Sequence, residues 1–383
     1  MKERKQQDTT YSSKQIICGI AGKMLTKKES ELFKKYPCGG FIIFGRNIDN
    51  SSKEEIIALN QSLRDLYKDR DIYILVDQEG GRVQRIKPST VRGATLYPAA
   101  SNLAADYTTS PQQTKNLVYQ NYHQLMHELK ELGFDSPCAP VADLYFDFAN
   151  KVIGDRSFGD NVNQVVDLCS AAIDGIMSAE GIPIIKHLPG HGRAIADSHL
   201  ALPVVKTDIQ ELERTDFKVF THLSSKIAKA NQIDRVWAMT AHIVYTALDR
   251  AHPATISKSV ISYLRKVIGF HGIIVSDALE MLALHGKVGE KLAKLKQILR
   301  SADSVMNLQD DPTLVNEIPK ILAKCNDSND VINICQQEIA ALHPDLIKSL
   351  IKQTHSSLAA GCDYVLHCNG NYDEMKGILS SFN

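Results

Sequence analysis

The residues best suited to chemistry gather in one stretch, residues 186–199. It reads Lys-His-Leu-Pro-Gly-His-Gly-Arg-Ala-Ile-Ala-Asp-Ser-His and holds two cations, three histidines and one carboxylate. Asp197 and His199 stand two residues apart, a spacing at which a carboxylate can hydrogen-bond an imidazole, orient it and raise its pKa. The apolar run 182–185 precedes this stretch. A strand ending in a shaped loop is therefore favoured over a plain histidine-rich surface loop.

A second candidate is Asp277, which follows the apolar run 273–275. A carboxylate held at the end of a buried strand, and kept ionised by nearby cations, suits a nucleophile. Aspartate is also a preferred N-cap residue, so a helix start at this position is the structural alternative.

Two further segments carry groups that can grip a polar ligand. Asp77 and Arg85 flank the run Asp-Gln-Glu-Gly-Gly-Arg-Val-Gln-Arg, and Arg156 lies in the glycine-bounded turn 152–159. Carboxylates and guanidinium groups bind hydroxyls well because they accept and donate several hydrogen bonds. The alternative to ligand binding is a structural role, in which a buried Asp–Arg pair only holds the long loop after residue 80 in place. Lys186 and His187 add donors at the end of the run 182–187.

These side chains need elements that bring them together, and the chain has eight apolar, β-branched runs to do so. Continuous apolar runs are typical of parallel strands buried on both faces. The predicted strands are Ile16–Gly22, Gly40–Gly45, Ile72–Asp77, Pro137–Asp143, Ile182–His187, Val236–His242, Gly272–Asp277 and Cys362–Asn369.

Helical patterns separate the runs, for example Ser51–Tyr67, Gln112–Leu132, Asn163–Ala179 and Ser257–Gly269. Strand–helix alternation of this kind predicts an α/β fold, a single-domain (β/α)8 TIM barrel, whose active site lies at the carboxyl ends of the strands. An open doubly wound sheet is less favoured, because no Gly-x-Gly-x-x-Gly follows the first strand. Six of the predicted strands end in polar residues, which supports a functional rim.

The remaining segments complete the domain, which we take as residues 1–383. Residues 1–14 are polar and expected to be disordered or peripheral. Residues 282–360 form a longer segment than one barrel helix requires. They are predicted to form a helical insertion between the seventh and eighth strands. Residues 371–383 are predicted to form a terminal helix.

Composition narrows the class of protein. Lys plus Arg equals Asp plus Glu at 44 each, so a net charge of zero argues against nucleic acid or an anionic membrane as a partner. No apolar run is long enough to span a membrane and no secretory signal is evident. The eight cysteines form no Cys-x-x-Cys pair and read as small buried hydrophobes in a reducing compartment. A cytoplasmic location is expected.

Four segments resemble the motifs of glycoside hydrolase family 3, and within it the bacterial β-N-acetylglucosaminidases. They are 77–85, 152–159, 186–203 and 275–281, and the similarity runs from about residue 16 to 277 and resumes at 359–369. The chain departs from the family pattern at Ala278, where a second Asp is frequent, and at Arg193.

The resemblance implies a retaining glycosidase with Asp277 as nucleophile, His199 as acid/base and Asp197 as its partner. It implies that Asp77, Arg85, Arg156, Lys186 and His187 hold the sugar. The implied substrate is a peptidoglycan turnover fragment, N-acetylglucosamine β-linked to anhydro-N-acetylmuramic acid with or without peptide. Such chemistry requires no metal or organic cofactor.

Three other functions use the same residues. A phosphorylase would accept phosphate in place of water, and a histidine acid/base tolerates an anionic acceptor. A zinc hydrolase would place His187, His191, His199 and Asp277 around the metal. A sugar-binding protein on a barrel that has lost its activity is the third.

Overall fold

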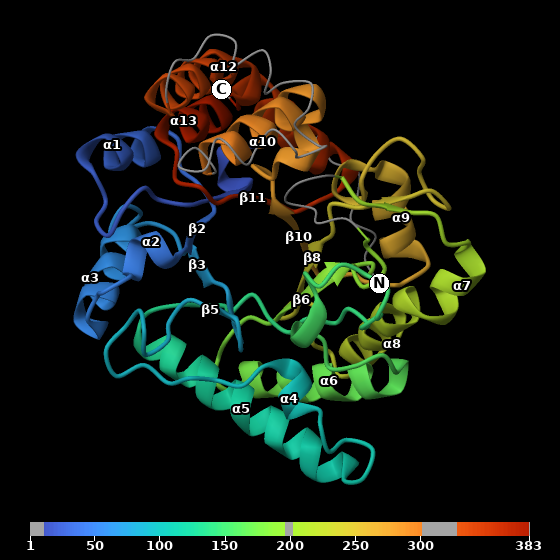
Figure 1. Cartoon of the computed structure of the whole chain (residues 1–383). Coiled ribbons are helices and arrows are strands. Elements are labelled where there is room, and N and C mark those ends of the chain that lie inside the picture. The colour runs from blue at the N-terminus through green and yellow to red at the C-terminus, as the bar shows by residue number, and fades with distance from the viewer. Residues whose placement is uncertain (1–10, 196–201, 301–327, 383) are drawn as a thin grey trace.

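The computed structural model of the chain describes residues 11–195, 202–300 and 328–382. Its centre is a curled, fully parallel sheet with the strand order β3-β2-β1-β11-β10-β8-β6. The strands are β1 (Ile16–Cys18), β2 (Gly40–Ile43), β3 (Tyr73–Val76), β6 (Ile184–Leu188), β8 (Trp237–Thr240), β10 (Ile273–Ala278) and β11 (Tyr364–His367). Figure 1 shows helices surrounding this sheet on its outer side, the arrangement of a TIM-barrel-like α/β fold.

One predicted strand, Pro137–Asp143, is wrong, and the sheet has seven regular strands rather than eight. This segment contacts its neighbours through two isolated parallel bridges, Leu75 to Ser136 and Val141 to Lys186. Backbone hydrogen bonds still join it to both sheet edges, from Val76 N to Ser136 O at 3.1 Å and from Ile184 N to Ala139 O at 2.9 Å. Prolines 137 and 140 have no N–H to donate, so a regular ladder cannot form here.

The helices follow in chain order. They are α1 (Lys27–Lys35), α2 (Gly45–Ile48), α3 (Lys53–Arg64), α4 (Ala100–Leu103), α5 (Pro111–Glu131), α6 (Val162–Ser178), α7 (Ile209–Arg214), α8 (Asp216–Lys229), α9 (Lys258–Lys266), α10 (Gly286–Arg300), α12 (Ser328–Ala360) and α13 (Tyr372–Ser380). Of these, α3, α5, α6 and α9 coincide with the four helical patterns named from the sequence. Local signals fix where they start: Ser52 and Glu55 form a capping box on α3, and Pro111 stands at the start of α5.

Short elements complete the path. The 3-10 helices are η1 (Ser13–Gln15), η2 (Gly154–Arg156), η3 (Ala254–Ile256) and η4 (Leu282–His285). Outside the main sheet, β4 (Gln78–Gly80) and β5 (Val83–Gln84) form an antiparallel hairpin. A second small pair, β7 (Val204–Val205) and β9 (Val244–Tyr245), is parallel.

The core has two layers, as strand alternation requires. Side chains on one face of the curled sheet form a cluster of their own: Ile17, Ile42, Leu75, Cys138, Ile184, Trp237, Met239, Val275, Leu366 and Cys368. Their neighbours along the strands, such as Ile16 and Cys18, pack against the helices in the larger cluster. Cys138 comes from the irregular segment, so that segment takes a place in the inner layer although it is not a strand.

The described part of the region between β10 and β11 is mostly helical, in η4, α10 and α12. In Figure 1, α10 and α12 lie beside α13. Leu295, Ile298, Val331 and Cys335 form a small apolar core of their own between α10 and α12.

The prediction that residues 1–14 are disordered or peripheral can be compared with the structure only from residue 11 onward. Of residues 1–14, Tyr11 packs against the main core, and residues 1–10 lie outside the described ranges. The seven cysteines in the described ranges are buried, as expected. None of the described helices has both the length and the apolarity that crossing a membrane would require.

Candidate active site

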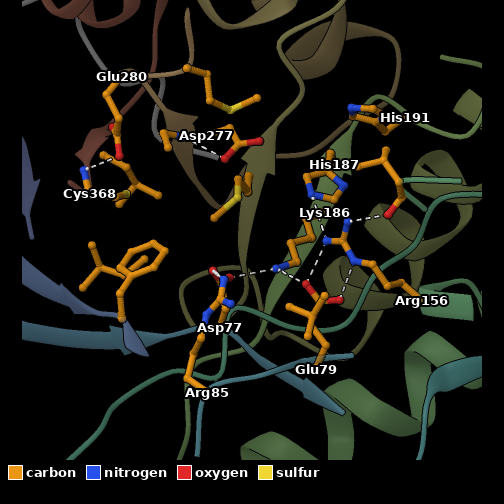
Figure 2. A pocket seen from close by; sticks show the side chains of 18 of the residues that line it. Asp77, Glu79, Arg85, Arg156, Lys186, His187, His191, Asp277, Glu280 and Cys368 are labelled. Carbon is orange, nitrogen blue, oxygen red and sulfur yellow. Dashed lines mark hydrogen bonds and ion pairs between the residues drawn. The ribbon is translucent and has the colours of Figure 1, made fainter. Parts of the chain in front are cut away.

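The carboxyl ends of the sheet strands open into a cavity of about 400 Å³. Residues in or just after six of the seven strands line it, together with the β4–β5 hairpin and η2. Figure 2 shows polar side chains from these elements around one pocket. Of the six polar strand ends, Asp77, Lys186 with His187, and Asp277 line this cavity. Asp143, His242 and Asn369 are not among the lining residues.

Asp277 lies within β10 and is not a helix N-cap, so that alternative is wrong. Its Oδ1 accepts a hydrogen bond from Ala278 N at 2.7 Å. The Ser276 hydroxyl donates to the Asp277 carbonyl and accepts from Leu366 N, which fixes the backbone. Burial favours the neutral acid, but charge interactions with His242 and His187 hold the pKa of Asp277 below its usual value. The carboxylate is thus ionised at neutral pH.

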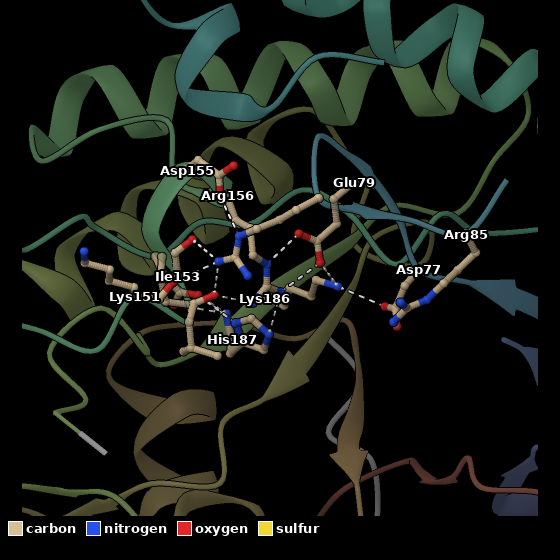
Figure 3. Close-up of polar contacts among 12 residues, drawn as sticks. Asp77, Glu79, Arg85, Lys151, Ile153, Asp155, Arg156, Lys186 and His187 are labelled. Carbon is tan, nitrogen blue, oxygen red and sulfur yellow. Dashed lines mark hydrogen bonds and ion pairs between the residues drawn. The ribbon is translucent and has the colours of Figure 1, made fainter. Parts of the chain in front are cut away.

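The predicted sugar grip forms a buried ion cluster (Figures 2 and 3). Lys186 Nζ lies 2.6 Å from Glu79 Oε1 and 3.2 Å from Asp77 Oδ1. Arg85 Nη2 reaches Asp77 Oδ2 at 3.2 Å. Arg156 makes two bonds to Glu79, at 2.7 and 2.8 Å. The Asp–Arg pair that we weighed as a loop pin therefore exists, and the same pair lines the cavity.

The charges in this cluster reinforce one another. Burial alone would raise the pKa values of Asp77 and Glu79, yet the cations beside them lower both. Burial likewise opposes the charge of Lys186, but Glu79 and Asp77 raise its pKa. All the groups stay ionised, so the cavity presents fixed acceptors and donors rather than neutral, adaptable ones.

Asp143, a predicted strand end without an assigned role, fixes the loop after β6. Its carboxylate accepts from His187 Nδ1 at 2.6 Å, from His187 N, and from His191 N at 2.6 Å. The bond to Nδ1 leaves His187 Nε2 facing Arg156 Nη2 at 3.5 Å. His187 is thereby held with one ring edge buried and the other turned to the cavity.

His242, another predicted strand end, contacts the backbone just after Asp277. Its Nε2 lies 3.0 Å from Ala278 O, and its Nδ1 lies 2.7 Å from the Thr255 hydroxyl. Because Thr255 is fully buried in η3, the imidazole links β8, η3 and β10. His242 thus positions Asp277 as well as lowering its pKa.

Glu280 is the cavity residue that sequence reasoning missed. Its Oε1 accepts from Cys368 N at 3.0 Å, while Oε2 is buried, makes no hydrogen bond and lies 3.7 Å from His367 Nδ1. Burial, with Glu374 and Asp277 as repelling neighbours, raises the pKa of Glu280 to about 7. The sequence held a feature that could have identified Glu280 as a cavity residue. It is a carboxylate three residues after Asp277, just beyond the end of the predicted strand. Glu79 was also missed, although it lies inside the quoted motif.

Two assigned residues, Asp197 and His199, lie outside the described residues. The chain leading to them is fixed: Arg193 pairs with Asp216 at 2.6 Å and Glu211 at 3.1 Å. Ala194 O accepts from Asn150 N at 2.9 Å. Arg193 therefore anchors the start of this loop.

Comparison with known proteins agrees with this architecture. Residues 13–342 match the glycosyl hydrolase family 3 N-terminal domain. A β-hexosaminidase of Haemophilus influenzae is 33% identical over 320 residues, 81% of this chain and 86% of that protein. A β-hexosaminidase of Alkalilimnicola ehrlichii is 36% identical over 270 residues, 70% of this chain and 73% of that protein.

A solved structure extends the likeness. The crystal structure of NagZ from Neisseria gonorrhoeae in complex with N-trifluoroacetyl-D-glucosamine aligns with a TM-score of 0.72 and 28% identity. The alignment covers 97% of this chain and 86% of that one. The family match runs on past Asp277 to residue 342, so most of the segment that we expected to lie outside the resemblance falls within it. On these grounds the chain belongs to glycosyl hydrolase family 3.

Proposed function

We propose that this protein is a retaining exo-β-N-acetylhexosaminidase that removes terminal β-linked N-acetylglucosamine. The observation that carries the proposal is the ionised Asp277 in one cavity with the Asp77–Lys186–Glu79–Arg156 cluster. Support comes from relatives named β-hexosaminidase and from the NagZ structure with a glucosamine derivative. The cavity of about 400 Å³ accommodates one sugar ring, which fits exo action on a terminal residue.

In the first step, an Asp277 oxygen attacks the anomeric carbon while the bond to the leaving oxygen breaks. His199 donates its proton to that oxygen, and a glycosyl ester on Asp277 results. In the second step, His199 takes a proton from water, the water oxygen attacks the anomeric carbon, and Asp277 leaves as a carboxylate. Two inversions give net retention. Asp197 orients the imidazole and stabilises its charged form.

A histidine acid/base suits this cavity because its walls already carry four carboxyl groups, those of Asp77, Glu79, Asp277 and Glu280. A fifth carboxyl group would have its pKa raised by the charged ones, whereas an imidazole escapes like-charge repulsion. Asp77 accepts from sugar hydroxyls, and Arg85, Lys186, Arg156 and His187 donate to the sugar.

The proposed substrate is a cell-wall turnover fragment, N-acetylglucosamine linked β-1,4 to anhydro-N-acetylmuramic acid, with or without peptide. Water is the proposed acceptor. Assays in phosphate buffer distinguish water from phosphate, because a phosphorylase would yield the sugar 1-phosphate. Turnover should be undiminished by excess chelator, since no step in this proposal involves a metal ion.

The test is covalent trapping with a fluorinated N-acetylglucosaminyl fluoride, whose fluorine slows the second step. Mass spectrometry of peptides from the trapped protein should place the label on Asp277, and Asp277→Asn should take up none. NMR of the first-formed product should show the β-anomer. A label on another residue would refute the nucleophile, and an α-anomer would refute retention.

A further inference from the structure

A row of four titratable side chains leads away from the active-site cavity, and no step of the proposed reaction uses it. The row begins at Glu280, just after β10, and continues through His367 on β11 and Glu374 on α13 to His343 on α12. Glu280 lines the cavity, and Figure 2 shows it in the same pocket as Asp277. The row therefore starts beside the proposed nucleophile.

Neighbouring members of the row lie within ion-pair distance of one another. His367 Nδ1 lies 3.7 Å from Glu280 Oε2, and His367 Nε2 lies 3.4 Å from Glu374 Oε2. Glu374 Oε1 lies 3.1 Å from His343 Nε2. The exposed fraction of the side chain is 18% at Glu280, 1% at His367, 5% at Glu374 and 29% at His343. The row thus connects the cavity to the protein surface through a buried middle.

The imidazole in the middle of the row has unfilled hydrogen-bonding capacity. Within the described ranges, neither ring nitrogen of His367 makes a hydrogen bond, and Glu280 Oε2 makes none either. Leaving buried polar groups without partners is unfavourable. A small approach of the side chains would satisfy all of them, since a protonated Glu280 can donate to Nδ1 while Nε2–H donates to Glu374. This arrangement is a continuous path along which a proton can move.

The groups around the row determine where its protons reside. The titratable and charged groups that face Glu280 and His367 are Asp277 on β10, Arg46 on α2, His285 in η4, Cys368 after β11 and Glu374 on α13. Burial and the two neighbouring carboxylates raise the pKa of Glu280 to about 7. Burial, with His285 and Arg46 beside it, lowers the pKa of His367 to about 3. At pH 7, His367 is therefore neutral and Glu280 is protonated in about half of the molecules.

The charge of Asp277 changes during the proposed reaction, and Glu280 lies close enough to respond. In the free protein, the Asp277 carboxylate disfavours a second negative charge on Glu280. Formation of the glycosyl ester removes the Asp277 charge, so ionisation of Glu280 becomes easier. When Asp277 leaves as a carboxylate in the second step, Glu280 is again driven to take up a proton.

We propose that Glu280 exchanges a proton with solvent through His367, Glu374 and His343, in step with the charge of Asp277. When the ester forms, the Glu280 O–H bond breaks and its proton passes to His367 Nδ1. The proton on Nε2 passes to Glu374 and leaves through His343 to water, so the imidazole stays neutral. The same transfers run in reverse when the ester is hydrolysed.

The inference rests on the proposed function, because it needs the covalent step on Asp277. Glu280 acts through Asp277 and makes no contact with the sugar in this scheme. It adds a charge that appears on the cavity wall when the charge of the nucleophile disappears. The electrostatic environment of the sugar thereby changes less between the two steps than it would with Asp277 alone.

Proton release during trapping tests the proposal. The full chain at pH 7, in unbuffered salt with an indicator dye, is mixed with the fluorinated N-acetylglucosaminyl fluoride. Transfer of the sugar to Asp277 releases fluoride and by itself no proton. Wild-type protein should release more protons than Glu280→Gln, by up to about half a proton per labelled molecule, because about half of the Glu280 side chains hold a proton at this pH. Other groups that titrate contribute equally to both proteins.

Two more variants separate the path from the replacement. Glu31→Gln makes the same change on the exposed surface of α1 and should release as many protons as wild type. His367→Leu should release fewer, because an ionised Glu280 would lack the Nδ1–H donor, and it provides the comparison if Glu280→Gln does not fold. Thermal unfolding identifies the folded variants.

Infrared difference spectra of the same reaction identify the group that loses its proton. On trapping, wild type should lose a protonated-carboxyl band that shifts in D2O, whereas the new ester band does not shift. Equal proton release by wild type and the Glu280→Gln and His367→Leu variants, at equal labelling of Asp277, would overturn the proton exchange. A wild-type protein that takes up no label would instead overturn the proposed function and, with it, this inference.

Discussion

At the scale of the residue, the surroundings of Asp277 fix the carboxylate that we propose as nucleophile. Its position is set by the strand, since Ser276 is hydrogen-bonded to Leu366 N on β11. One carboxylate oxygen is tied to Ala278 N. His242 holds Ala278 O from the other side. The side chain is thus placed before substrate arrives, and little reorganisation remains for the reaction.

The first prediction concerns this residue. Asp277→Ala and Asp277→Asn should lower kcat by about three orders of magnitude or more, because the covalent step loses its nucleophile. Hydrolysis of an aryl N-acetylglucosaminide measures kcat, and thermal unfolding confirms that the variants fold. A near-normal kcat in a folded variant would show that the nucleophile lies elsewhere.

The second prediction concerns Glu280 and pH. Its folded pKa of about 7 lies above the unfolded value of about 4.3, so the folded state holds the proton more tightly. Stability from this group is therefore full at low pH and is lost as the pH rises from about 4.3 to 7. Glu280→Gln has no proton to lose, so it should be more stable than wild type above pH 7, by at most about 4 kcal/mol.

Urea unfolding at pH 4 and pH 8 measures this difference. The advantage of Glu280→Gln should appear only at the higher pH. If the two proteins kept a constant difference across that range, Glu280 would have an ordinary pKa in the folded state.

Membership of the candidate site could be predicted for residues that lie in short motifs rich in charged and polar side chains. Asp77, Arg85, Lys186 and His187 lie in such motifs, and the structure brings them into one cavity with Asp277. The partnership of Glu79 with Arg156 was not predictable, because it joins the β4–β5 hairpin to η2 across 77 positions of sequence. The roles of Asp197 and His199 stay predictions.

At the scale of the element, the junction between the irregular segment and β6 depends on Asp143. This fully buried carboxylate serves three donors of the next strand and loop, on His187 and His191. Burial opposes its charge, but His187 lowers its pKa. Its stabilising contribution is therefore present above the unfolded pKa of about 3.9 and is lost as the pH falls toward the folded value.

The third prediction follows. Asp143→Asn should destabilise the fold by about 2–4 kcal/mol at pH 7, because an amide cannot accept from all three donors and adds donors of its own. Its kcat/KM should also fall, since His187 is no longer held. Denaturant unfolding and aryl-glycoside hydrolysis measure the two effects.

Asp174→Asn, on the exposed face of α6, is the matched control and should change neither quantity. An Asp143→Asn protein as stable as this control would mean that the three donors find other acceptors.

The strands themselves were predictable because both faces are buried, which leaves long apolar runs. Seven of the eight runs contain strands of the sheet. The run 137–143 contains no strand, because an apolar pattern gives no information about missing backbone N–H groups. Its two prolines, which lack that group, were the sequence feature that argued against a strand.

At the scale of the whole molecule, the sheet is completed by its last strand. β11 pairs with β1 at Ile17 and Leu366 and with β10 at Val275 and Tyr364. It stands between β1 and β10, the strand that carries Asp277, and Leu366 on β11 and Cys368 just after it line the cavity. The barrel-like class could be predicted from sequence, but the placement of the helices between β10 and β11 could not, because those helices pack in a small core of their own.

The fourth prediction tests this dependence. A chain ending at residue 360 should lack cooperative thermal unfolding and all activity, since β1 and β10 lose their shared neighbour. Circular dichroism and aryl-glycoside hydrolysis measure these properties, and a chain lacking only Asn383 serves as the control. A cooperative transition in the shorter chain would mean that β1 and β10 can pair without β11.

The place of β11 also has a consequence for biosynthesis. Domains fold as units while the ribosome adds about 5–20 residues per second, and non-local strand pairing comes late. The early strands must therefore wait many seconds, with apolar edges uncovered, until the final strand leaves the exit tunnel. The sheet would be complete only after β11 has been synthesised and released, and during that wait the nascent chain would be a natural client for chaperones.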